Sequence, residues 1–183
     1  MIGLSSFPIS QTHQAIENPL YAHVLINHLP EMGLGLALLA LVAGFVLRSR
    51  KARMVGLFLV LVTSALAWPV LRTGQKGYNQ IYYSLELEDR AWLDAHMEEA
   101  ERWIWGFLAV AGLALAGLLI PHKWPRAETF LTPGVLVAGL WMFLVSGYIA
   151  YLGGRVRHIE FRDTPPPVPV SVSRNNTHPN QQQ

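Results

Sequence analysis

The chain has 183 residues, of which 51% are hydrophobic and 14% are charged, and its formal net charge is +2. Soluble domains carry roughly 25% charged residues, so this composition and a mean hydropathy of +0.27 indicate a membrane-embedded bundle. The lack of cysteine excludes disulfides, thiol nucleophiles and covalently attached c-type haem. The basic residues are few and scattered, so we expect no nucleic-acid partner.

Four long apolar runs follow one another, and each is about long enough to cross a bilayer as a helix. Residues 1–18 are polar and irregular, and Pro19 suits the first position of a helix that we expect to kink near Pro30. No run alternates like a strand, and helices are the alternative to closed barrels in lipid. We therefore predict an all-α fold, a four-transmembrane-helix bundle in residues 19–163. The predicted spans cover residues 29–47, 54–71, 103–120 and 130–152.

A polar segment, residues 72–102, separates the second span from the third. Its second half, from about Glu86, predicts an extra amphipathic helix before the third span and continuous with it. Residues 164–183 are rich in proline, asparagine and glutamine, which predicts a disordered or polyproline-like tail.

The basic residues predict an orientation in the membrane. The loop Arg48–Arg53 holds four basic residues in six, and the loop after the third span holds Lys123 and Arg126. Cytoplasmic loops of membrane proteins carry an excess of such residues. We therefore predict a multi-pass protein of the bacterial inner membrane, with both termini and the middle segment on the outer side.

Four histidines lie at the predicted outer ends of the spans. Neutral imidazole is a common ligand of haem and metals. Two antiparallel hairpins packed into one bundle bring these ends together, so we expect His28, His96 and His158 to face a common pocket. The alternative is that each is an ordinary polar residue at a helix end. The four are His23 and His28 at the first span, His96 before the third and His158 after the fourth.

Glutamates and arginines accompany these histidines. Glu31 and Glu99 each follow a histidine by three residues, which puts each pair on one helix face. We expect Glu31 at the floor of the pocket and Arg155 or Arg157 at its rim. The candidate haem-binding residues are His23, His28, His96, His158, Arg155 and Arg157. The candidate residues for a non-haem metal are His28, Glu31, His96 and Glu99.

Three segments together resemble a known group of proteins. They are His23-Val-Leu-Ile-Asn-His28-Leu-Pro30, then His96, then Gly153-Gly154-Arg-Val-Arg-His158. This pattern resembles a family of small bacterial four-helix membrane proteins filed as a domain of unknown function. That family reads His-Pro, a few residues, His-Phe-Pro, and later Gly-Gly, a few residues, His-Gly, so Val24, Leu29 and Ile159 depart from it. The resemblance covers about residues 23–162 and implies the architecture and the choice of histidines, without an activity.

We predict an integral membrane subunit of a respiratory or redox complex. It would serve as an anchor or as an electron-transfer subunit with haem b, with quinol as a candidate partner. Two alternatives stay open: a structural subunit without a cofactor, and a membrane protein with a non-haem metal. No hydrolase, P-loop or dinucleotide motif occurs in the sequence, so we expect no independent catalytic activity. The expected partners are the lipid bilayer and other membrane or periplasmic subunits.

Overall fold

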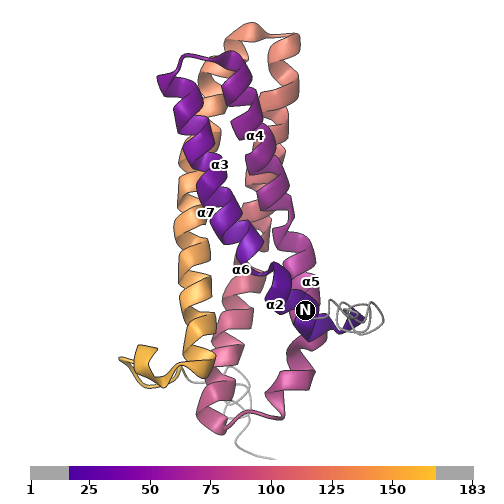
Figure 1. The fold of residues 1–183 in the computed structure, drawn as a ribbon, viewed down its shortest axis with the longest axis vertical. Coiled ribbons are helices and arrows are strands. Elements are labelled where there is room, and N and C mark those ends of the chain that lie inside the picture. The colour runs from indigo at the N-terminus through magenta and orange to yellow at the C-terminus, as the bar shows by residue number, and fades with distance from the viewer. Residues whose placement is uncertain (1–16, 168–183) are drawn as a thin grey trace, which may run out of the picture.

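The computed structural model describes residues 17–167 as a bundle of helices, with no strand in that range (Figure 1). The predicted all-α architecture is thereby confirmed. Most of the predicted N-terminal segment and tail, residues 1–16 and 168–183, lie outside the described residues. The α-helices are α2 (Pro19–Ile26), α3 (His28–Val46), α4 (Arg50–Ala65), α5 (Ala67–Tyr82), α6 (Leu87–Leu119) and α7 (Glu128–Arg157). Three short 3-10 helices are η1 (Ile120–His122), η2 (Pro125–Ala127) and η3 (Ile159–Phe161).

Four helical stretches are long and apolar enough to cross a membrane, as predicted. They are Pro19–Val46, Arg50–Tyr82, Leu87–His122 and Pro125–Arg157. Their outward faces carry large apolar side chains, for example Leu36 at 67% exposed and Val137 at 70% exposed. A soluble monomer rarely exposes contiguous apolar surface on this scale, so the exterior suits a lipid environment.

Prolines interrupt the first two of these stretches. Pro30 has no N–H for the carbonyl of Ile26, four residues earlier, and α2 ends at Ile26. Pro69 stands in the same relation to Ala65, the last residue of α4. One residue then separates α2 from α3, and one separates α4 from α5. The first two spans therefore break at similar depths, while α6 runs without interruption.

The polar segment between the second and third spans is helical almost throughout. α5 continues the second span to Tyr82, and residues 83–86 make the turn into α6. Residues 87–101 form the first turns of α6, so the described structure shows no separate amphipathic helix. These turns stay ordered because Trp92 and Leu93 are buried against the last turns of α7, at Leu152 and Val156.

The four spans pack as two antiparallel hairpins. α3 pairs with α4 and α6 pairs with α7, and both short turns lie at the upper end of Figure 1. α4 also packs on α6, and α3 on α7, which closes the bundle. Small residues permit this: a Cβ on Gly56 would lie 2.7 Å from the Cα of Leu41. Such close approach of backbones drives helix association in lipid, where apolar burial alone contributes little.

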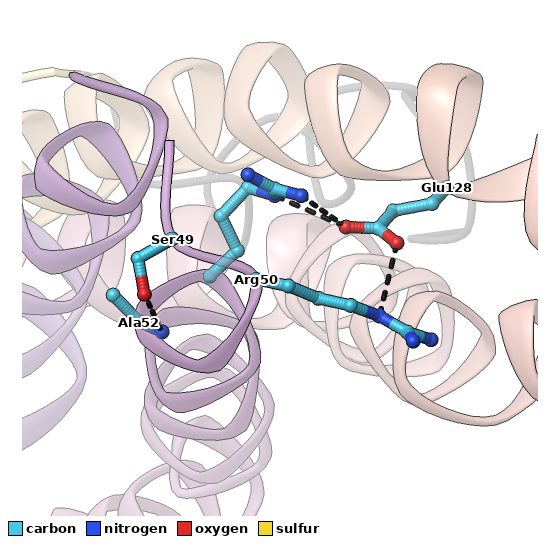
Figure 2. Close-up of polar contacts among 5 residues, drawn as sticks. Ser49, Arg50, Ala52 and Glu128 are labelled. Carbon is cyan, nitrogen blue, oxygen red and sulfur yellow. Dashed lines mark hydrogen bonds and ion pairs between the residues drawn. The ribbon is translucent and has the colours of Figure 1, made fainter. Parts of the chain in front are cut away.

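An ion-pair network ties the two hairpins together at the end that carries the short turns. Glu128, at the start of α7, accepts hydrogen bonds from Arg53 Nε at 3.1 Å and Nη2 at 2.6 Å. Arg50 Nε lies 3.2 Å from the other carboxylate oxygen (Figure 2). Ser49 caps α4 beside this network by accepting the N–H of Ala52 (Figure 2). Ion pairs between α4 and α7 therefore hold the two hairpins together at this end of the bundle.

Candidate functional site

A cavity of about 550 Å³ lies in the half of the bundle remote from the short turns. Its walls come from α2, the first turn of α3, α5, the first half of α6 and the last turns of α7. Beyond the two proline breaks, α2 packs on α5 and α5 packs on α6, while α2 has little contact with α6 or α7. The space between these elements stays open. The volume falls within the roughly 300–1,000 Å³ of small-molecule and cofactor sites.

His23, on α2, is fixed in the cavity wall by the neighbouring helix. Its Nδ1 lies 3.0 Å from the backbone carbonyl oxygen of Val70 on α5. A carbonyl can only accept, so Nδ1 carries the proton, and in the neutral ring Nε2 keeps a free lone pair. The ring lies on Gly74, where an added Cβ would be 3.0 Å from Cε1 and 3.1 Å from Nδ1. The absence of a side chain at position 74 makes room for the imidazole.

His96, on α6, is held in the same way by the second hairpin. Its Nδ1 lies 2.9 Å from the backbone carbonyl oxygen of Ile149 on α7. Its ring lies on Gly153, where a Cβ would be 3.1 Å from Cε1 and 3.2 Å from Nδ1. In both hairpins the accepting carbonyl stands four residues before the glycine that the ring covers. Within residues 17–167, no hydrogen bond reaches Nε2 of either histidine.

His28 and His158 also line the cavity, but they are exposed residues at its margin. The His28 side chain is 70% exposed, and its Nδ1 is 4.0 Å from the Glu31 carboxylate. His158 follows the last residue of α7, with Nδ1 at 2.8 Å from the Glu160 carboxylate. The backbone of Glu160 and then the His158 side chain hold the pKa of that carboxyl below its usual value. Within residues 17–167, neither of these histidines forms a hydrogen bond to a neighbouring helix.

The two predicted arginines lie in different environments. Arg157 is exposed and lines the cavity. Arg155 is buried and is not among the wall residues, because its guanidinium lies over the rings of Trp92 and Tyr151, at 4.6 and 4.3 Å. It also donates to the backbone oxygen of Phe161 at 2.8 Å. Arg155 therefore holds the chain after α7 in place instead of standing at the rim of the pocket.

The four residues predicted as metal ligands do not meet in one place. Glu31 lines the cavity near His28. Glu99 instead accepts hydrogen bonds from Arg102 at 2.7 Å and from the Trp103 indole at 3.1 Å. Within residues 17–167, no group of three or more histidine, aspartate or glutamate side chains is placed to hold a metal ion.

The groups that hold the two imidazoles were not predicted from the sequence. These are the carbonyls of Val70 and Ile149 and the surfaces of Gly74 and Gly153. Gly153 stood in the Gly-Gly motif, but nothing in the sequence connects it to His96, 57 positions away. Among residues 17–167, the arrangement offers two imidazoles in the wall of a mainly apolar cavity, each with Nδ1 on a backbone carbonyl and no hydrogen bond at Nε2.

Fold and cavity define a class: an all-helical bundle of four potential membrane spans with a histidine-bearing apolar cavity at one end. No family model, no curated protein and no solved structure matches this chain. The resemblance to the family of small bacterial membrane proteins therefore stays a prediction.

Proposed function

We propose that this protein is a multi-pass inner-membrane subunit that binds a b-type haem in the cavity and transfers electrons within a redox complex. One observation carries the proposal: two imidazoles, each oriented by a carbonyl of a neighbouring helix, line the same apolar cavity. Histidines that bind metals usually donate their other ring N–H to a carbonyl or carboxylate in this way, which fixes the tautomer.

The requirements of a b-type haem support the choice of cofactor. Haem needs axial nitrogen ligands, an apolar pocket and polar groups for its propionates. The cavity has histidines on opposing hairpins, an apolar lining and the exposed Arg157 in its wall. A non-haem metal is less well served, since no group of three or more ligating side chains forms within residues 17–167.

The orientation follows from the basic loops. With Arg48–Arg53 and the loop at Lys123 in the cytoplasm, the cavity lies toward the outer side of the inner membrane. The polar first turns of α6 would lie at or beyond the outer interface. A haem at this depth would accept electrons from quinol within the bilayer and pass them to an outer acceptor or partner subunit.

The test is the spectrum of the full-length protein, produced with an adequate haem supply and purified in detergent. We expect a reduced-minus-oxidised difference spectrum with the bands of a b-type haem, and a pyridine haemochrome assay giving about one haem per chain. The control is His122→Ala, because His122 lies near the opposite end of the bundle, and this variant should keep its haem. A preparation without haem would refute the proposal. Bound metal would then favour the metal alternative, and a cofactor-free protein the anchoring alternative.

A further inference from the structure

We infer that His23 and His96 are the two axial ligands of the haem, each binding through Nε2. We further infer that Gly74 and Gly153 are positioning residues that set the angle of each ring. This assignment rests on the haem-binding function proposed above, and it excludes His28 and His158 as ligands.

The first support is that the same local arrangement occurs twice. In each hairpin the first span carries a histidine, and the second span supplies a carbonyl and, four residues later, a glycine. Four residues is about one helical turn, so the carbonyl and the glycine lie on the same face of their helix. The first hairpin is broken once in each span, between α2 and α3 and between α4 and α5, whereas α6 and α7 of the second hairpin are continuous. Both hairpins therefore present an imidazole to the cavity in the same way, although their helices differ in continuity.

The second support is the chemistry of the ring nitrogens. Ligating histidines usually donate the other ring N–H to a carbonyl or carboxylate, which fixes the tautomer and the ring plane. Both His23 and His96 have Nδ1 on a backbone carbonyl, at 3.0 and 2.9 Å. A backbone carbonyl inside a helix cannot rotate away. Nε2 is therefore the nitrogen available to iron in both residues, and its direction is set before the haem binds.

The glycines explain how the rings reach these positions. A Cβ at either site would lie 3.0–3.2 Å from two ring atoms, which is closer than ordinary van der Waals contact. An added methyl group would push the ring away from the helix, lengthen the Nδ1 bond and turn Nε2. The helix α7, which carries Gly153, also offers a comparison, because a Cβ on Gly147 of this helix would have no neighbour within 4 Å.

The other two histidines are less suitable. The side chains of His28 and His158 are 70% and 54% exposed. His158 stands after the end of α7 and donates to Glu160, whose side chain is itself 66% exposed. Such a partner is free to rotate in water and does not fix a ring plane. Arg157 remains available at the margin for an anionic group such as a propionate.

Four histidine variants of the full-length protein test the assignment. Wild type should contain six-coordinate, low-spin haem by absorption and electron paramagnetic resonance spectroscopy. His23→Gly and His96→Gly should lose the haem or keep a high-spin, five-coordinate form. Imidazole added to the buffer should restore the low-spin spectrum, which also establishes that these variants are folded. His28→Ala and His158→Ala should keep the wild-type spin state and haem content.

The glycines provide a second test with a matched control. Gly74→Ala and Gly153→Ala should weaken haem binding by about 10- to 100-fold, the usual effect of disturbing groups that orient a ligand. Gly147→Ala should leave haem binding unchanged. Equal effects of Gly153→Ala and Gly147→Ala would overturn the positioning role.

The failures of the two proposals are distinguishable. A haem-free wild type would defeat the proposed function and the assignment together. A haem-containing wild type whose low-spin signal survives in His23→Gly or His96→Gly would overturn the assignment alone. Loss of that signal in His28→Ala or His158→Ala would do the same.

Discussion

Replacing Gly56 by alanine should destabilise the bundle, even though alanine is the better helix former. The new Cβ would lie 2.7 Å from Cα and 2.8 Å from N of Leu41, both backbone atoms of α3. To restore ordinary contact at 3.4 Å, the two helices must separate locally by about 0.7 Å. A gap of this size forfeits about a quarter to a half of each dispersion contact across the interface.

The net effect is the difference between two terms. Overpacking of this kind costs about 1–3 kcal/mol, while removing glycine from a helix interior gains at most about 1 kcal/mol. We therefore expect the free energy of unfolding to fall by up to about 2 kcal/mol relative to wild type, and by about 1–3 kcal/mol relative to a glycine variant without crowding. Gly112→Ala is the control, because a Cβ there meets nothing within 4 Å, and it should be neutral or stabilising.

The assay is denaturation of the detergent-solubilised protein by sodium dodecyl sulfate, followed by circular dichroism. The difference in stability between the two glycine variants isolates the effect of crowding, because both substitutions raise helix propensity and only the one at Gly56 introduces crowding. A Gly56→Ala protein as stable as Gly112→Ala would refute the claim that α3 and α4 touch through their backbones. A similar loss in Gly112→Ala would show that crowding is not the cause.

Three further predictions concern the ends of the bundle. Glu128→Gln should lower the free energy of unfolding by about 1–3 kcal/mol, because a partly buried carboxylate with two arginine partners is lost. Glu98→Gln, in an exposed helical pair, should change it by no more than about 0.5 kcal/mol, and equal effects in denaturation curves would contradict this. Asp89→Asn weakens the 2.6 Å bond to the chain after α7, so limited proteolysis should cleave residues 158–167 faster than in wild type, and unchanged cleavage would count against that anchoring role. Of single cysteines at Ser49 and Ser84, only the one at Ser84 should react with an impermeant reagent on intact cells, and the reverse pattern would invert the proposed topology.

The architecture was predictable because its signals are local. Apolar runs of about twenty residues have few alternatives to a membrane helix, and α3 covers almost the same residues as the first predicted span. The break in that span falls just before Pro30, because the carbonyl that loses its partner lies four residues earlier. α5 was missed in part because Gly74 and Gly77 are poor helix formers. Packing of α2 and α6 on α5 supplies the stability that these residues lack.

The candidate site was only partly predictable, because its geometry depends on contacts between distant residues. Four histidines at the predicted span ends, His23, His28, His96 and His158, line one cavity in the structure. The pattern of span ends did not distinguish His23, held by a carbonyl 47 positions away, from the exposed His28. Arg155 looked like a free cation at a helix end, yet its partners include aromatic rings, a backbone oxygen and the side chains of the segment after α7. No periodicity or spacing encodes such partners.

The two proline breaks have a consequence for motion within the first hairpin. His23 lies before the first break, and both the Val70 carbonyl and Gly74 lie after the second. The imidazole and the groups that orient it therefore belong to one small unit, α2 with α5, which two helix breaks separate from α3 and α4 and which also packs on α6. His96 belongs to the unbroken second hairpin. Bending at the two breaks would change the distance between the two imidazoles and leave both hydrogen bonds intact, because each bond lies within one packed pair of helices.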